Sequence, residues 1–347
     1  MKTILIYGSY GYTGRLITEE CRKQNLNVIL SGRNAAQLAE QSRQTGYPFE
    51  VCEINDSKAL RHLLSKTSVV IHCAGPFRHT AREMVKACLD TGVHYTDITG
   101  EYDVFEQLAQ LHDEATKRNI MIMPGTGFDV VPSDCLAVHL KNKLPDATHL
   151  QLAFTALKGG ISRGTRKSMI EGVGHPGKVR KDGKLVDVWP GDKTMEVDFG
   201  AFRQMTMCIP WGDVSTAWFS TSIPNIEIYA GVSPKIIKWA RLSRYLNSLL
   251  RMRIVKSYLL RQADKKAGPA AERIREGKSY LWGKVWNDHG LTVEARLETL
   301  NGYVLTAKTS VLVASKIINQ NFKAGFQTPA MAYGKDLIME VEGTQRN

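Results

Sequence analysis

The sequence predicts an α/β chain, in which a doubly wound parallel sheet is followed by a second, α+β domain built on a mixed sheet. Strand-like and helix-like segments alternate up to about residue 130, and three closely spaced glycines follow the first strand-like run. After about residue 146, short strand-like segments are joined by turn residues instead. We therefore expect one domain over 1–130, with 325–340 packing back on it, and a second domain over 131–324.

The first half contains six apolar runs that have the length and continuous hydrophobicity of buried parallel strands. Helix-like segments separate them, and Gly46 and Gly92 stand where two of these helices would end. Parallel strands need helical crossovers, so the alternation predicts repeated βαβ units. The expected strands are 3–8, 27–34, 49–54, 68–77, 93–98 and 120–125, and the expected helices are 15–24, 35–46, 56–66, 80–92 and 102–119.

The loop after the first strand, YGSYGYTGRL, carries Gly8, Gly11 and Gly14 at a spacing of three. Glycines at this place in a doubly wound sheet allow a tight turn and let the backbone approach a pyrophosphate closely. The N-terminus of the following helix offers free amide groups and the positive end of the helix dipole. The loop therefore predicts a dinucleotide site.

The end of the second strand, SGRN, distinguishes between the two nicotinamide dinucleotides. An acidic residue there would bind the ribose hydroxyls of NAD, but this chain has Ser31, Arg33 and Asn34. A guanidinium pairs with a phosphate dianion and stacks on adenine. We therefore predict NADP(H) as the cofactor, and the alternative is that Arg33 is an ordinary solvated arginine.

Composition restricts the class of protein. The 347 residues carry a formal net charge of +12, and 43% of them are hydrophobic, which is enough for two folded cores. The six cysteines form no CxxC pair and have no zinc-binding spacing, so we expect reduced thiols and no metal site. We find no signal-peptide pattern and no run of roughly 18 apolar residues. We expect a cytoplasmic protein and leave peripheral membrane contact open.

The second half has the pattern of a mixed or antiparallel sheet, with an Asp-Gly turn inside 178–188. Tyr280 and Lys284 have the Tyr-x-x-x-Lys spacing of short-chain dehydrogenases, but they lie in a strand-like run. A strand would separate them by about 13 Å, so we reject them as a catalytic pair. The expected strands are 150–157, 178–188, 204–212, 215–220, 226–231 and three more within 279–308, and the expected helices are 162–172 and 328–338.

One segment concentrates the positive charge, because residues 234–266 carry ten Lys or Arg and one Asp. Apolar residues recur among them at roughly helical spacing. One interpretation is one or two surface helices with a solvated basic face. The other is that 234–262 form a basic amphipathic element that contacts anionic lipid or an acidic carrier protein. We expect no nucleic-acid partner, because no binding module is recognisable.

Six motifs in chain order resemble the saccharopine dehydrogenase-like oxidoreductases, most closely the branch that contains trans-acting enoyl reductases. They are YGSYGYTGRL, SGRN, CAGPF, HYTDITGE, PGTGFDVVPSD and GFQTPAMAYG. The resemblance implies an NADP-binding Rossmann domain, a second domain around a mixed sheet, and reductase chemistry. Members of the family differ widely in substrate, so the resemblance indicates the cofactor better than the reaction.

The resemblance also implies which loops bind the cofactor. Gly8, Tyr10, Gly11, Tyr12, Thr13 and Gly14 would hold the pyrophosphate, Ser31, Arg33 and Asn34 would hold the 2′-phosphate end, and Cys73, Ala74, Gly75, Pro76 and Phe77 would flank the nicotinamide ribose.

Hydride transfer also needs a group that stabilises or protonates the developing anion. We rank Asp129 and Lys158 first, since Asp129 begins the crossover into the second domain and Lys158 follows a strand end. Tyr95, Asp97 and Glu101 at the fifth strand and Lys167 beyond the glycine loop of the second domain are further candidates. Water or a substrate group could equally supply the proton.

These observations predict an NADPH-dependent reductase that acts on a C=C or C=O of a lipid-like or acyl-carrier-bound substrate. One alternative is a saccharopine-reductase-type oxidoreductase of imines and amino acids, in which Arg163 and Arg166 would bind substrate carboxylates. Another is a membrane-associated NADP-binding scaffold without turnover.

Overall fold

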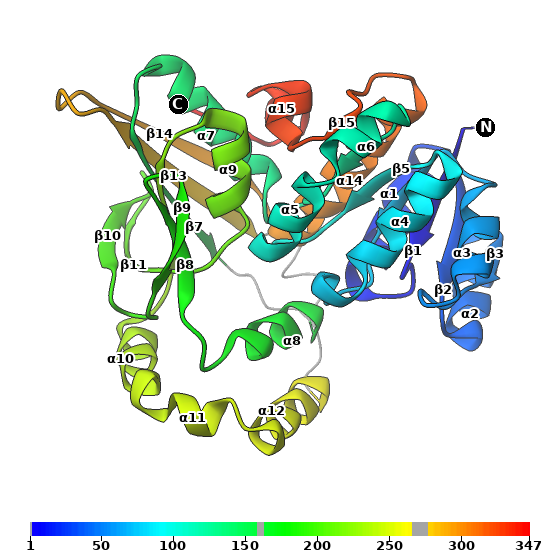
Figure 1. Cartoon of the computed structure of the whole chain (residues 1–347), viewed down its shortest axis with the longest axis horizontal. Helices are drawn as coiled ribbons and strands as arrows, with labels where there is room; N and C mark the ends of the chain where they lie inside the picture. The colour runs from blue at the N-terminus through cyan, green and yellow to red at the C-terminus, as the bar shows by residue number, and fades with distance from the viewer. Residues whose placement is uncertain (1, 158–162, 266–276) are drawn as a thin grey trace. The chain divides into compact units, whose positions relative to one another are not determined.

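The computed structural model describes residues 2–157, 163–265 and 277–347, which divide into two compact units (Figure 1). Unit 1 runs up to Val131 and also contains Tyr303–Tyr333. Unit 2 comprises Pro132–Gly302 and Gly334–Asn347. Unit 1 therefore includes residues 303–324, which the sequence pattern placed in the second domain.

Unit 1 is built on a seven-stranded parallel sheet, sheet A, with the order β15-β6-β5-β4-β1-β2-β3. The chain leaves β3 at one edge and returns to β4 beside β1, so the topological switch point lies between the carboxyl ends of β1 and β4. The strands are β1 Thr3–Tyr7, β2 Asn27–Gly32, β3 Phe49–Val51, β4 Val69–His72, β5 His94–Asp97, β6 Met121–Met123 and β15 Gly325–Phe326.

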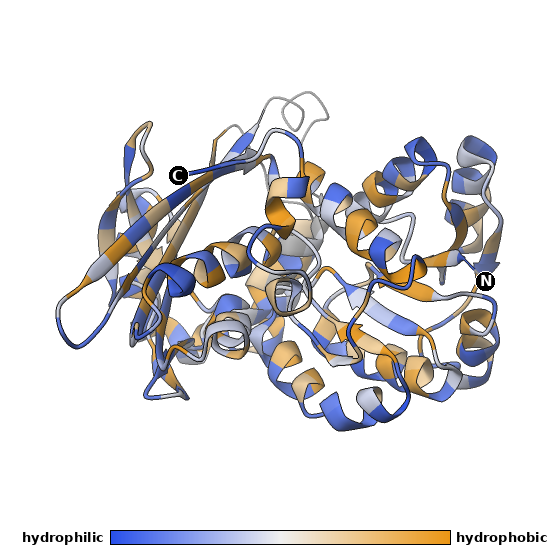
Figure 2. Ribbon diagram, turned by 90° about the horizontal axis from the view of Figure 1, so that it is seen from above, coloured by the Kyte–Doolittle hydropathy of each residue, from blue (hydrophilic) through white to orange (hydrophobic). Residues whose placement is uncertain are grey.

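Helices lie on both faces of sheet A (Figure 2). The helix faces that pack on the sheet are apolar; the helix Ser57–Leu64, for example, buries Leu60, Leu63 and Leu64. Strands β1 and β4 are buried between the two helical layers. The helices are α1 Tyr12–Lys23, α2 Ala35–Thr45, α3 Ser57–Leu64, η1 Phe77–His79, α4 Ala81–Thr91, α5 Tyr102–Ala109, α6 His112–Lys117, α14 Gly302–Ile318 and α15 Pro329–Tyr333.

Unit 2 is built on a mixed sheet, sheet B, in which β7 and β12 pair in parallel and the other pairs are antiparallel. Its main order is β10-β11-β12-β7-β13-β14-β16, with β8 and β9 attached beside β12. The strands are β7 His149–Leu157, β8 Gly177–Lys181, β9 Lys184–Val188, β10 Thr194–Asp198, β11 Arg203–Cys208, β12 Asn225–Gly231, β13 Lys278–Trp286, β14 Thr292–Leu300 and β16 Gln345–Arg346.

The helical elements of unit 2 begin at the boundary with unit 1. They are α7 Val131–Lys143, α8 Arg163–Gly172, α9 Asp213–Thr221, α10 Pro234–Ser243, η2 Arg244–Leu246, α11 Asn247–Leu250, α12 Arg253–Lys265 and η3 Leu337–Glu340. The fold class is therefore the one that the sequence predicts.

Two segments expected as strands are helices, and two expected helices are divided, of which the one over 328–338 becomes α15 and η3. Residues 215–220 lie in α9, and the third strand expected within 279–308 is the start of α14. Both helices are largely buried, so their inner and outer faces are not marked by polar residues, and a buried helix then has the apolar pattern of a strand. The helix expected over 102–119 is divided into α5 and α6.

Candidate cofactor and catalytic site

The glycine loop closes directly on β1 and leads into α1. The Gly8 amide donates to the Ser31 carbonyl (2.7 Å), and the Gly11 amide donates to the Gly8 carbonyl (3.0 Å). Gly8 has φ +80°, which L side chains rarely adopt. A Cβ at Gly14 would lie 2.5 Å from the Gly8 carbonyl oxygen and 2.7 Å from that of Ser9. The loop therefore folds tightly over the first turn of α1.

The N-terminus of α1 is left open for an anion. Its N-cap residue is Gly11, no side chain of the described residues caps it, and its first turn holds no acidic residue. The first amides of a helix have no partner within the helix, and the helix dipole favours negative charge there. The residues present therefore fit the pyrophosphate of a dinucleotide.

A buried polar network, which the sequence reasoning missed, supports the loop from below. The Ser9 hydroxyl donates to Oε1 of Gln41 (2.8 Å), and Nε2 of Gln41 donates to the Ser9 carbonyl (3.0 Å) and to the Thr18 hydroxyl (3.2 Å). All three residues are buried. The available signal was a glutamine on the inward face of the helix expected at 35–46.

The three residues expected at the 2′-phosphate have different contacts at the end of β2. Ser31 is buried and donates to the Glu50 carbonyl (2.8 Å), while Oδ1 of Asn34 caps α2 by accepting from the Gln37 amide (3.0 Å). The Arg33 side chain is exposed and makes no ion pair with any residue that the structure describes. Arg33 is thus the group best suited to a phosphate dianion.

Tyr10 lies at the same end of the sheet rather than along the helix start. A Cβ at Gly32 would come within 2.6 Å of its ring, so the ring covers the last residue of β2. Tyr10, which was expected at the pyrophosphate, therefore lies beside the end of β2.

The loop after β4, residues 73–77, lies against the glycine loop, because a Cβ at Gly8 would meet Ala74 at 3.0 Å. The Gly75–Pro76 peptide bond is cis. The carboxylate of Glu101 accepts from the Phe77 amide (3.0 Å) and the Arg78 amide (2.9 Å). The loop is thereby fixed to the end of β5.

His72 in β4 and Cys73 in the following loop are both titratable, and of the two His72 lies in the core while Cys73 is partly exposed. His72 is fully buried, its Nε2 lies 2.9 Å from the Thr80 hydroxyl, and burial lowers its pKa to about 3. Burial raises the pKa of the Cys73 thiol well above its usual range. The imidazole is therefore neutral and the thiol stays protonated at neutral pH.

Asp97, the last residue of β5, connects two loops at the carboxyl end of sheet A. Its carboxylate accepts from the Tyr95 hydroxyl (2.6 Å), the Thr99 amide (2.9 Å) and the Gly125 amide (2.8 Å). Burial raises its pKa to about 7, against the opposing effect of these hydrogen bonds. Asp97 positions the loop after β6.

Asp129 lies in that loop and differs from Asp97 in its contacts. Its side chain is partly exposed, it has no hydrogen bond or ion pair with the described residues, and burial raises its pKa to about 7. A Cβ at Gly100 would come within 3.0 Å of its Oδ2, so the carboxyl group lies beside the loop after β5. Lys158, the other expected catalytic residue, falls outside the described residues.

Helix α14 completes this edge of unit 1 from far along the sequence. The Phe128 amide donates to the Thr306 hydroxyl (2.9 Å), which fixes the loop carrying Asp129. The rings of Tyr12 and Tyr303 meet edge to face at 5.0 Å. The sequence reasoning missed these contacts because it expected residues 301–308 as a strand of the second domain.

Comparison with known proteins bears on the class of domain that carries this loop. Residues 4–123 match the saccharopine dehydrogenase NADP-binding domain. A Homo sapiens saccharopine dehydrogenase-like oxidoreductase is 28% identical over 204 residues, 51% of this chain and 47% of its own length. A putative trans-acting enoyl reductase of Mycobacterium tuberculosis is 28% identical over 182 residues, 48% and 43% of the two chains. This chain thus spans about half the length of the curated relatives it matches.

A solved structure extends the likeness in fold to the whole chain. Apo saccharopine dehydrogenase (L-Glu forming) from Saccharomyces cerevisiae superposes with a TM-score of 0.67, covering 98% of this chain and 96% of its own, at 13% identity. Within the described residues, no helix has the length and hydrophobicity needed to cross a bilayer. Residues 4–123 thus match a saccharopine dehydrogenase NADP-binding domain, whose cofactor is NADP(H), and about half of the chain is similar to saccharopine dehydrogenase-like oxidoreductases.

Proposed function

We propose that this chain is an NADPH-dependent reductase that reduces a C=C or C=O bond of a lipid-like or carrier-bound acyl substrate. The observation that carries the proposal is Asp129, a carboxyl group with a pKa of about 7 and no hydrogen bond or ion pair to the residues that the structure describes, at the carboxyl end of a sheet that binds NADP(H). Perturbed carboxyl groups in such positions are typical of proton donors.

In this proposal, each group of described residues has a separate role. The uncapped start of α1 binds the pyrophosphate, and Arg33 binds the 2′-phosphate. When bound, the cofactor supplies a hydride. Asp129, protonated in about half of the molecules near pH 7, donates a proton to the anion that reduction leaves on the substrate and is reprotonated from water. Hydride and proton together account for the two electrons and two hydrogens added.

The substrate class rests on the relatives and on the contact that Arg166 makes in unit 2. One relative is named a putative trans-acting enoyl reductase, a name that points to an acyl substrate carried by another molecule. Arg166, a candidate for binding a small carboxylate substrate, instead donates to the Ala263 carbonyl (3.3 Å). These two observations favour an acyl substrate over an amino acid.

An imine or amino-acid oxidoreductase is the second candidate, since the fold of a saccharopine dehydrogenase covers nearly the whole chain. A panel assay separates the two. Purified protein is incubated with NADPH and, in turn, an enoyl thioester, a ketoacyl thioester, or an α-keto acid with a primary amine, and NADPH absorbance is followed. We expect oxidation with a thioester. Turnover only with the amine and keto acid would establish the second candidate, and turnover with none would favour a scaffold.

A further inference from the structure

The segment 234–262, from α10 into α12, leaves an unusual amount of apolar surface open. Of the fifteen large hydrophobic side chains exposed in the described part of the chain, nine belong to it. In unit 2, α10, α11 and α12 follow one another as a single arc (Figure 1). The nine are Ile236, Trp239, Leu242, Tyr245, Leu246, Leu249, Met252, Ile254 and Tyr258.

The segment 234–262 is attached to the rest of unit 2 by a buried side chain and by hydrogen bonds. Ile237 is buried, and the Arg241 Nε donates to the Gly191 carbonyl (2.9 Å). The Arg251 Nε donates to the Gly174 carbonyl (2.7 Å), and the Lys256 Nζ donates to the Glu171 carbonyl (3.0 Å). One face of the segment is therefore anchored on unit 2, and the opposite face is presented outward.

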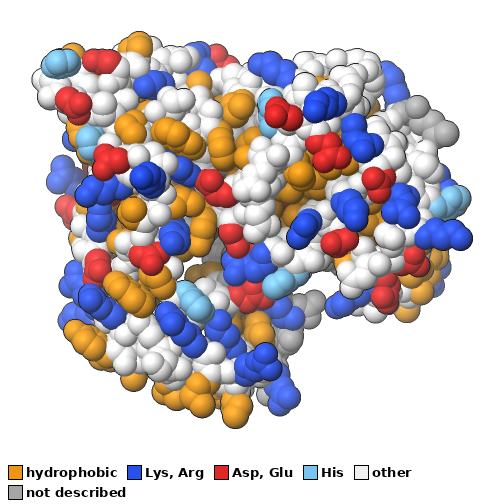
Figure 3. Space-filling view, viewed as in Figure 1, with side chains coloured by type: hydrophobic (Ala, Val, Ile, Leu, Met, Phe, Trp, Pro, Cys, Tyr) orange, Lys and Arg blue, Asp and Glu red, His pale blue; other side chains and the backbone are white. Residues whose placement is uncertain are grey.

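The outward face is also strongly basic. The segment contains eight Lys or Arg and no acidic residue. Lys235, Lys238, Arg253 and Arg261 form no ion pair or hydrogen bond with the described residues. In the space-filling view, orange hydrophobic side chains alternate with blue ones over these helices (Figure 3). An anionic partner with an apolar interior would match both properties at once.

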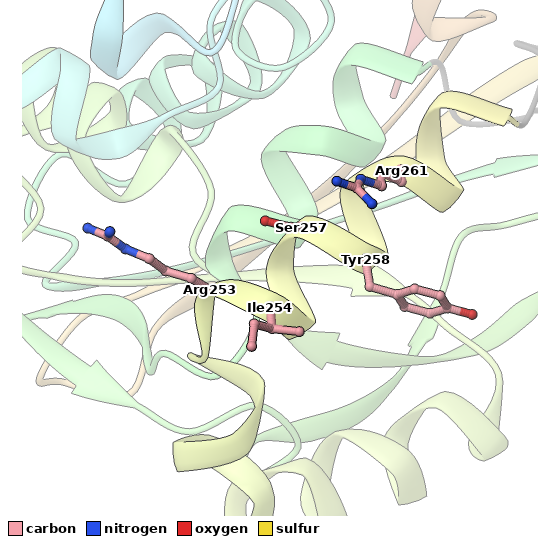
Figure 4. Close-up of a pocket in the computed structure, with 5 residues that line it drawn as sticks. All are labelled: Arg253, Ile254, Ser257, Tyr258 and Arg261. Carbon is pink, nitrogen blue, oxygen red and sulfur yellow. The ribbon is translucent and has the colours of Figure 1, made fainter.

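A surface hollow of about 420 Å³ lies along α12. Arg253, Ser257, Tyr258 and Arg261 line it from successive turns of α12, with the Arg253 side chain pointing to one side and the Tyr258 ring to the other (Figure 4). A guanidinium binds phosphate oxygens through paired N–H groups, and tyrosine prefers the interface between water and lipid. This arrangement suits the phosphates of lipid headgroups.

We propose that the segment 234–262 docks on the surface of an anionic lipid bilayer. The helices are too short to span a bilayer, so they would lie in the interface with Trp239, Tyr245 and Ile254 among the acyl chains and the basic residues at the headgroups. A second copy of the chain is a poor occupant, because its own Lys235, Lys238, Arg253 and Arg261 would face the same four positive charges. The proposal does not depend on the proposed reduction.

Sedimentation and quenching with vesicles test the proposal. Vesicles of phosphatidylcholine alone and with phosphatidylserine, some carrying brominated chains, are mixed with the protein at low and high salt. We expect binding to the anionic vesicles only, weakened by salt, with quenching of tryptophan fluorescence by bromine. Arg253→Gln with Arg261→Gln should weaken binding about 25-fold, roughly fivefold for each charge. Trp239→Phe should remove most of the quenching.

Two control variants alter a tryptophan and an exposed apolar residue outside the segment. Trp286→Phe, in β13 of sheet B, should retain the quenching, and Leu291→Ser, an exposed apolar residue outside the segment, should retain binding. Unchanged thermal melting and NADPH affinity show that the variants fold.

The proposal is overturned if wild-type protein fails to bind anionic vesicles at low salt. It is equally overturned if binding occurs without quenching of Trp239, or if polyglutamate binds as tightly as the vesicles, since an acidic protein would then be the better partner.

Discussion

Asp97 and Asp129 show that two carboxyl groups with the same raised pKa can have different roles. Burial raises both pKa values to about 7, but Asp97 accepts three hydrogen bonds that hold the loops after β5 and β6. Asp129 has none with the described residues, so its proton can be exchanged with a bound molecule. The sequence placed both residues near strand ends, but it could not show which of them is engaged by the backbone.

Replacing the Asp129 carboxyl group should reduce turnover and change its pH dependence. We expect Asp129→Asn to lower kcat at least about 100-fold, because a general acid contributes about that much. The wild-type rate should fall as pH rises through about 7, since the acid must be protonated, and the variant should lose this limb. Steady-state rates from pH 5 to 9 provide the measurement, with Asp113→Asn, an exposed carboxylate in α6, as the control. A rate within threefold of wild type would remove Asp129 from the mechanism.

The same substitution should change stability in the opposite direction. The folded-state pKa of about 7 lies above the ordinary 3.8, so the stabilisation from the protonated form is complete below about pH 4 and is lost as pH rises through 7. Asp129→Asn should therefore be more stable than wild type at pH 8, by about 1–2 kcal/mol after solvent screening. Thermal melts at pH 4, pH 5 and pH 8 should show the difference growing with pH and largest at pH 8.

Arg33 should determine the preference for NADPH. The exposed guanidinium at the end of β2 makes no ion pair with the described residues, so a phosphate contact costs no existing interaction. We expect NADPH to bind at least tenfold more tightly than NADH, which requires about 1.4 kcal/mol. Titration calorimetry of Arg33→Ala should show this preference removed with NADH affinity unchanged, while Lys117→Ala in α6 keeps it. An alanine variant that retains the preference would show that Arg33 is only a solvated arginine.

At the scale of elements, β1, its glycine loop and α1 are the part of the molecule that the sequence predicts best. The strand, turn and helix each have a local signal: an apolar run, glycines at fixed spacing and a helical period. Helices α9 and α14 have no such signal, because burial on most sides makes nearly all their residues apolar or small. Their contacts, including that of Thr306 with the loop of Asp129, depend on residues distant in sequence.

Two glycines of the loop should respond differently to alanine. At Gly14 a Cβ would lie 2.5 Å from a backbone oxygen, so Gly14→Ala should destabilise the fold by about 1–3 kcal/mol and weaken NADPH binding. At Gly11 the nearest atom would be at 3.1 Å, so Gly11→Ala should fold nearly normally and still lose at least tenfold in NADPH affinity. Melting curves with NADPH titrations distinguish them, and Gly172→Ala, which meets no atom within 4 Å, is the control. Normal binding by Gly11→Ala would place the pyrophosphate elsewhere.

At the scale of the whole molecule, the two kinds of sheet follow from two kinds of sequence pattern. Alternation of strand and helix gives the parallel sheet of unit 1, and strands joined by turns give the mixed sheet of unit 2. The boundary between units is less visible in the sequence, because α14 returns to unit 1 after the last long strand of sheet B. The cofactor loops could be predicted from the local sequence pattern alone. The contacts of Tyr303 and Thr306 could be found only in the complete fold.

The central claim, reduction by hydride transfer from NADPH at unit 1, is tested most directly by isotope transfer. The protein is incubated with NADPH that carries deuterium at the transferable position, together with an enoyl or ketoacyl thioester or, separately, with an α-keto acid and a primary amine, and the products are analysed by mass spectrometry. We predict a reduced thioester with one deuterium on the reduced bond, formed by wild type and lost in parallel with turnover in Asp129→Asn. Deuterium that appears only in the amine formed from a keto acid and a primary amine, or in no product at all, would contradict the account.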